Sequence, residues 1–111
     1  MAIPLIRSGY DAKIMVRVRV DGTNENLTGA TVEASLVDAT KTTELIVDTA
    51  QSSGTTGADW ASGLVAVVFN AAATTALVAA DVAYIELGIT LSGTRLPCDS
   101  VPVRIEKGWT L

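Results

Sequence analysis

The sequence contains no histidine and only one cysteine, Cys98, among its 111 residues. Without histidine, a His-based catalytic triad, an imidazole general base and a His-containing zinc site are all excluded. A single cysteine also excludes a disulfide within the chain and a Cys-based zinc site. We therefore expect no enzyme activity, no catalytic residues, no cofactor and no metal site, and we interpret Cys98 as a small, half-buried residue.

Charged residues and aromatic residues are also scarce. Charged residues make up 18% of the chain, below the usual value of about 25%, and aromatic residues make up 5%. The net charge of -4 does not attract a polyanion, so we expect no nucleic-acid partner. No apolar run reaches the roughly 18 residues of a membrane span, and the apolar stretch Ala2–Ile6 is too short for a signal peptide.

What is present is alternation of apolar and polar residues. From Tyr10 to Val20, every second residue is apolar from Ile14 onward, which is typical of a strand with one buried face. The same period recurs at 82–91 and at 101–105, where Pro102 predicts a sheet edge or a bulge because it lacks an N–H donor. Turn residues follow every 8–12 positions or so, as in a sandwich.

Other segments complete the predicted fold. We expect strands at 31–37, at 43–47 and at 63–69, the last as a central strand, and a short helix at Ala71–Leu77 capped by Asn70. Residues 48–58 lack periodicity and predict a long mobile loop, 23–26 are loop-like, and 95–100 look irregular. The predicted fold is all-β: an antiparallel, immunoglobulin-like β-sandwich of about seven strands with one short helical turn, in a domain at 10–111 preceded by an N-terminal arm at 1–9.

Several short motifs occur in an order that resembles a known family. They are Leu27-Thr-Gly-Ala30 after Asp21-Gly22, then Phe69–Leu77, Tyr84-Ile-Glu86, the turn at 92–94 and the strand at 101–105. Together they span about residues 9–110 and resemble small immunoglobulin-like structural proteins of tailed bacteriophages, in particular the N-terminal domain of phage upper baseplate proteins. The resemblance implies a non-enzymatic virion protein, made in the host cytoplasm, that acts as a tail, baseplate or neck adaptor through protein–protein interfaces. A capsid decoration protein and a small non-phage immunoglobulin-like binding module remain as alternatives.

Such a protein acts through its surface, and the sequence offers candidate contact residues. They are apolar residues near the two ends and an Arg- and Met-bearing strand face, since Arg and Met are enriched in interfaces: Ile3, Leu5, Ile6, Met15, Arg17, Arg19, Trp109 and Leu111. The expected partners are other virion proteins and further copies of this chain in a symmetric assembly, with no membrane contact. The apolar arm can add a strand to its own sandwich or to a neighbour, and burial energy alone does not choose between these outcomes.

Overall fold

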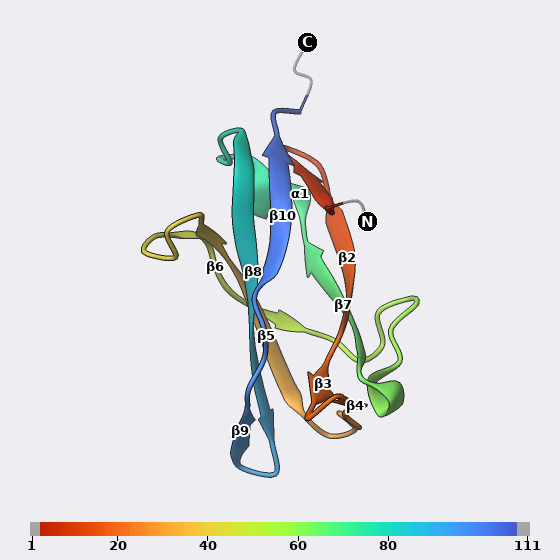
Figure 1. Cartoon of the computed structure of the whole chain (residues 1–111). Helices are drawn as coiled ribbons and strands as arrows, with labels where there is room; N and C mark the ends of the chain where they lie inside the picture. Colours follow the sequence, from red (N-terminus) through yellow and green to blue (C-terminus); the bar gives the residue numbers. More distant parts are fainter. Residues whose placement is uncertain (1–2, 109–111) are drawn as a thin grey trace.

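The computed structural model describes residues 3–108, and they form an immunoglobulin-like β-sandwich (Figure 1). One sheet has the strand order β1-β10-β8-β5-β6, with β9 paired to β8; the second sheet is the pair β2-β7, and β3 and β4 form a small hairpin. The elements are β1 Leu5–Arg7, β2 Ala12–Arg17, β3 Arg19–Val20, β4 Thr23–Asn24, β5 Thr31–Asp38, β6 Glu44–Gln51, the 3-10 turn η1 Trp60–Ser62, β7 Leu64–Phe69, α1 Ala71–Thr74, β8 Ala80–Leu91, β9 Thr94–Leu96 and β10 Val101–Glu106. The predicted all-β class is confirmed.

Alternation along the strands builds the core between the two sheets. In β2, Ala12, Ile14 and Val16 are buried while the residues between them face solvent. Ile85 and Ile89 of β8 meet them from the larger sheet, in a single cluster of buried side chains. Because one period-two pattern sets which face is buried, the register of each strand is strongly specified.

Two hairpin turns follow the predicted chemistry. Asp21 and Gly22 have φ values of 53° and 79°, and Ser92 and Gly93 have 51° and 80°. Positive φ at both central residues is the feature of the two-residue turns whose twist matches paired strands. The turn signals at 21–22 and 92–94 were therefore interpreted correctly, although Thr23–Asn24 continues as β4 rather than as a loop.

A glycine is required where β7 begins. Gly63 has a φ of +82°, and a Cβ there would lie 2.6 Å from the Val18 carbonyl oxygen and 2.9 Å from that of Glu25. Its own carbonyl oxygen accepts a 2.7 Å hydrogen bond from the Val18 N–H. The 3-10 turn and the β3 region thus approach each other more closely than any side chain at position 63 allows.

Three predicted segments differ from the structure. β6 continues to Gln51, so pairing with β5 orders the first part of the predicted loop and leaves 52–58 as the connection. Thr94–Leu96 forms β9 at the end of the β8 hairpin, because the tight turn brings it into register. β7 is not central: among the described residues it pairs with β2 and with no other strand.

The short helix is shorter than predicted, and its last residue is hydrogen-bonded to the segment between β1 and β2. The Asn70 side chain accepts from the Ala73 N–H, which confirms the N-cap. Thr74 is fully buried, and its hydroxyl accepts from the Gly9 N–H at 3.1 Å and donates to the Tyr10 carbonyl at 2.8 Å. These bonds hold α1 against the segment that passes from one sheet to the other. No helix within residues 3–108 is long and apolar enough to span a membrane.

The N-terminal segment completes the larger sheet. β1 pairs in parallel with β10, with Leu5 opposite Arg104 and Arg7 opposite Glu106, so the sandwich is not purely antiparallel. β1 pairs only with residues 104–106, and within the described chain the outer side of β10 at Pro102 has no strand partner. A register shift also falls between Val103 and Ile105. The predicted edge or bulge at Pro102 is confirmed.

Candidate protein interface

The exposed face of β2 is the first candidate surface. Lys13, Met15 and Arg17 alternate with buried residues and point away from the core, and Met15 retains 42% of its surface. Arg19 follows on β3, where its Nε donates to the Asn24 side chain at 3.0 Å. Among residues 3–108 neither Arg17 nor Arg19 forms an ion pair. The structure thus brings three cationic side chains and a methionine onto one side of an acidic protein.

The backbone of β2 is open along its outer edge. Val18 donates to the Gly63 carbonyl, and the register continues unbroken from Arg17↔Leu64 to Ala12↔Phe69. In an antiparallel ladder hydrogen-bonded pairs alternate with non-bonded pairs. The backbone N–H and C=O groups of Lys13, Met15 and Arg17 therefore point away from β7. Within the described chain no strand pairs with this edge.

The opposite edge of the same sheet is closed by the chain itself. The Gln51 side chain accepts from the Val68 N–H at 2.8 Å and donates to the Val68 carbonyl at 3.3 Å. Asp59 exchanges two backbone hydrogen bonds with Leu64 at the start of β7. A side-chain amide thus replaces a neighbouring strand at Val68, so the β2 edge is the accessible one of the two.

Of the candidate contact residues near the N-terminus, one lies in the core and two lie on the surface. Ile6 is fully buried among core side chains, because the central residue of β1 points inward when β1 pairs with β10. It is therefore part of the core and has no surface to offer a partner, whereas Ile3 and Leu5 are exposed. The arm lies on its own domain, which is one of the two outcomes left open by the sequence. Trp109 and Leu111 lie outside the described residues.

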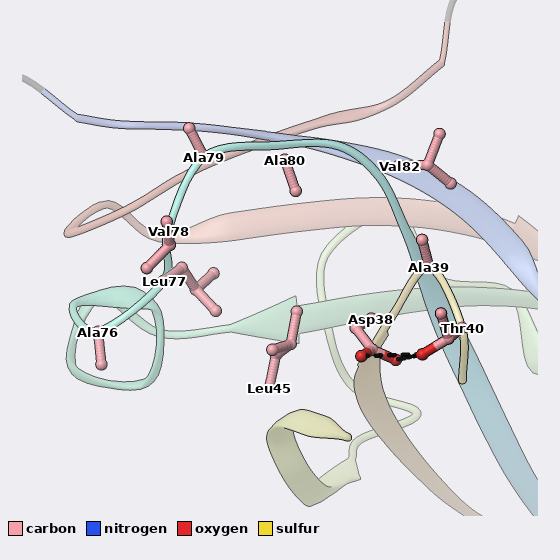
Figure 2. A pocket seen from close by; sticks show the side chains of 10 residues that line it. All are labelled: Asp38, Ala39, Thr40, Leu45, Ala76, Leu77, Val78, Ala79, Ala80 and Val82. Atoms are coloured by element: carbon pink, nitrogen blue, oxygen red, sulfur yellow. Dashed lines mark hydrogen bonds between the residues drawn. The ribbon is translucent and has the colours of Figure 1, made fainter. Parts of the chain in front are cut away.

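A surface that sequence analysis missed lies at the end of the sandwich near α1. Val78 is 80% exposed in the connection from α1 to β8. A hollow of about 380 Å³ lies beside it, lined from the β6 side by Leu45 and from the β8 side by Val82 (Figure 2). A second hollow of about 360 Å³ also touches Val78 and extends to Gly108. The apolar run 76–80 outside any predicted strand was the signal, but the expected helix to Leu77 obscured it.

One polar cluster has the composition of a reactive site. Ser100 donates to Glu86 at 2.8 Å, the Lys41 Nζ donates to the Ser100 hydroxyl at 2.9 Å, and Lys41 lies 4.6 Å from the centre of the Tyr84 ring. Lys41 also forms a 3.9 Å ion pair with Glu86. The carboxylate and the aromatic face are both favourable contacts for the Lys41 ammonium group, and the Ser100 hydroxyl donates to the carboxylate and not to the lysine. The cluster instead fastens the β5–β6 turn to β8 and to the start of β10.

The pKa values of two side chains elsewhere are shifted by their surroundings. Hydrogen bonds from backbone N–H groups, that of Thr42 first, lower the pKa of the Asp38 carboxyl below its ordinary value. Burial raises the pKa of the Cys98 thiol, so this half-buried thiol is protonated at neutral pH and weakly nucleophilic. Within residues 3–108 no group of three or more potential ligands is positioned to hold a metal ion.

The fold places the chain in the class of immunoglobulin-like β-sandwiches, and a comparison with solved structures makes this more specific. The chain is similar to the N-terminal domain of phage TP901-1 ORF48, with a TM-score of 0.54 and 16% sequence identity over 96% of this chain and 84% of that one. No protein-family model matches the chain, and no curated protein matches it. At this level of identity the likeness establishes the fold, and the resemblance to a phage domain drawn from the sequence is confirmed at that level.

Proposed function

We propose that this chain is a non-enzymatic structural protein of a bacteriophage virion that acts through protein–protein contacts. The observation that carries the proposal is the match to a phage protein domain over 96% of this chain and 84% of that one. The order of the motifs between residues 9 and 110 supports the same class independently of the coordinates. Fold alone does not define function, so the surfaces must supply the means of assembly.

The open edge of β2 supplies one such means. A strand from another virion protein or from a second copy can pair with the outward backbone groups of Lys13, Met15 and Arg17. Each backbone hydrogen bond contributes about 0.5–1.5 kcal/mol, and the cationic side chains favour a strand that carries acidic residues. Edge strands left unpaired are sites of association, and repeated association around a symmetry axis gives a ring.

Within the virion we assign the chain to the tail, as a baseplate or neck adaptor. Its partners are then other tail proteins and further copies of itself, held together without nucleic acid or membrane contact. Support for the tail position comes from the motif resemblance to upper baseplate proteins, and the exposed Ile3, Leu5 and Val78 provide additional apolar contact area.

The experiment is negative-stain imaging of purified phage particles labelled with an antibody against this chain. Label at the tail tip or neck is the expected result. Label distributed over the capsid would contradict the tail assignment and favour a decoration protein. Particles that never carry label, from cells that express the chain, would contradict the virion role itself.

Two substitutions test the β2 edge in the same particles. Met15→Pro removes an N–H that points away from β7, so the internal ladder keeps its bonds while a partner strand loses a donor. Arg17→Glu reverses a charge beside it. Both should fold and fail to enter particles, whereas Arg95→Glu on β9 should enter normally. Normal incorporation of both β2 variants would show that another surface makes the contact.

A further inference from the structure

The space between the two sheets opens to solvent along the side that carries the edges of β2 and β10. The chain passes from β1, which lies beside β10, to β2 in the other sheet, so both edges flank this side (Figure 1). Within the described chain no strand covers β2 along this edge or β10 at Pro102. A hollow of about 200 Å³ lies between them, lined by Val16 of β2, Leu87 of β8 and Val101 of β10.

The walls of this side hollow are continuous with the core. Leu87, Cys98 and Val101 are partly exposed and pack against the cluster of buried side chains. Two arginines and one carboxylate, Arg17, Arg19 and Asp99, also line the hollow and give it an excess of positive charge. Apolar side chains that end beside an open strand edge are the surface that a further strand would cover.

The two edges beside the side hollow differ in what they offer a further strand. Pro102 has no N–H to donate, so the edge of β10 lacks a donor where β1 does not reach it. On β2, Lys13, Met15 and Arg17 each present both an N–H and a C=O, because the residues between them are the ones bonded to β7. An added strand therefore pairs with β2.

We propose that an extended segment of another protein, in which acidic residues alternate with aliphatic ones, pairs with the outer edge of β2 and inserts an aliphatic side chain into the side hollow. This inference rests on the proposed use of the β2 edge in assembly and specifies its occupant. Residues directly opposite one another share a face of the sheet. The positions opposite Lys13 and Arg17 therefore favour acidic side chains, and those opposite Ile14 and Val16 face the core side, where the hollow lies.

A second copy of this chain fits the edge less well. An antiparallel pairing of two β2 strands that uses all three outward residues is centred on Met15, and it places Lys13 opposite Arg17, a like-charge pair that is unfavourable. The acidic edge strand of the chain, β6, shifts register twice against β5, and its Ile46 is buried in the core. Such irregularities block pairing along an edge, so we assign the segment to a different protein.

The probe is the peptide Ser-Glu-Leu-Thr-Leu-Glu-Ser, blocked at both ends. Its sequence reads the same in both directions, so the acids and leucines are placed alike in a parallel or an antiparallel pairing. Hydrogen exchange of the ¹⁵N-labelled chain gives the first readout. Millimolar peptide should slow exchange of the outward amides of Lys13, Met15 and Arg17 several-fold, and it should change Ile14 and Val16 little because their amides already face β7.

Alkylation of Cys98 by iodoacetamide gives the second readout, since this residue lines the side hollow and is the only cysteine of the chain. The peptide should slow the reaction several-fold. A matched peptide with threonine in place of both leucines should not slow it, and one with lysine in place of both glutamates should bind about tenfold more weakly or worse. Arg17→Glu should weaken binding of the acidic peptide, whereas Arg95→Glu, the same change on β9, should not.

Three outcomes overturn the proposal. Equal binding of the glutamate and lysine peptides would refute the charge requirement, and protected β2 amides with unchanged alkylation of Cys98 would refute insertion into the hollow. Protection of the same amides that grows with protein concentration, without peptide, would identify a second copy as the occupant. If no peptide binds while Met15→Pro and Arg17→Glu still fail to enter particles, this occupant is wrong and the proposed function stands. Peptide binding by a chain that never enters particles would support the occupant and contradict the proposed function.

Discussion

The contribution of β1 to stability can be measured by truncating Ile6. This side chain is fully buried, so Ile6→Ala removes three carbons from the core. At about 0.8 kcal/mol per methylene plus the cost of the cavity, we expect a loss of about 2–4 kcal/mol in the free energy of unfolding. For a domain of this size that corresponds to a decrease in Tm of about 10–20 °C.

The control is the preceding residue. Leu5 lies on the same short strand but is exposed, so Leu5→Ala should cost less than about 1 kcal/mol. Urea denaturation monitored by tryptophan fluorescence gives both values, and an unchanged slope shows that the extent of unfolding is the same. If Ile6→Ala stays within about 0.5 kcal/mol of the wild type, or if Leu5→Ala is equally costly, then β1 is not docked on β10 as described.

Three further predictions concern the framework that holds the surfaces in place. Gly63→Ala should lower the free energy of unfolding by about 2–4 kcal/mol in urea titrations, because the added Cβ collides with backbone atoms at a position of positive φ. Gly29→Ala, also at positive φ but with nothing within 4 Å of its Cβ, should lower it by only about 1 kcal/mol. Equal losses in the two variants would contradict the collision. Thr74→Val should lower the free energy of unfolding by about 1–3 kcal/mol because it removes a buried hydroxyl with three hydrogen-bond partners, Gly9, Tyr10 and Ala71. Thr74→Ser keeps the hydroxyl and should lose less; the reverse order would show that packing alone matters there. The lowered pKa of Asp38 contributes stability that is fully present above the ordinary value of 3.8 and is lost as the pH falls through the folded value. In thermal melts, the Tm of Asp38→Asn should therefore fall less steeply below about pH 4 than the Tm of the wild type. Identical dependence of Tm on pH in the two proteins would refute this.

The parts of the fold that could be predicted are those encoded locally. Alternation in β2 and β8 defined their buried faces, and Asn70 identified the start of α1 because its side chain caps a backbone N–H three residues away. The turn pairs were visible because only a few residues tolerate two successive positive φ values. In each of these cases the structure is determined by residues close together in the sequence.

The parts that could not be predicted depend on partners distant in sequence. The second half of β6 has no periodicity, and it becomes a strand because β5 pairs with it. β7 lies at an edge, and its outward backbone groups at Val68 are hydrogen-bonded by the Gln51 side chain, which belongs to a strand of the other sheet. The inward direction of Ile6 follows from a parallel pairing across 99 positions of the chain, and the exposure of Val78 follows from the early end of α1.

The most direct test of the virion assignment is the amount of this chain in purified phage particles. Particles are banded on a density gradient, washed in high salt, and analysed by mass spectrometry against an isotope-labelled standard of the chain and of the major tail protein. A structural component gives the same fixed ratio to the major tail protein in every preparation. A chain that is absent from the particles, or whose ratio falls with each wash, would contradict a structural role in the virion.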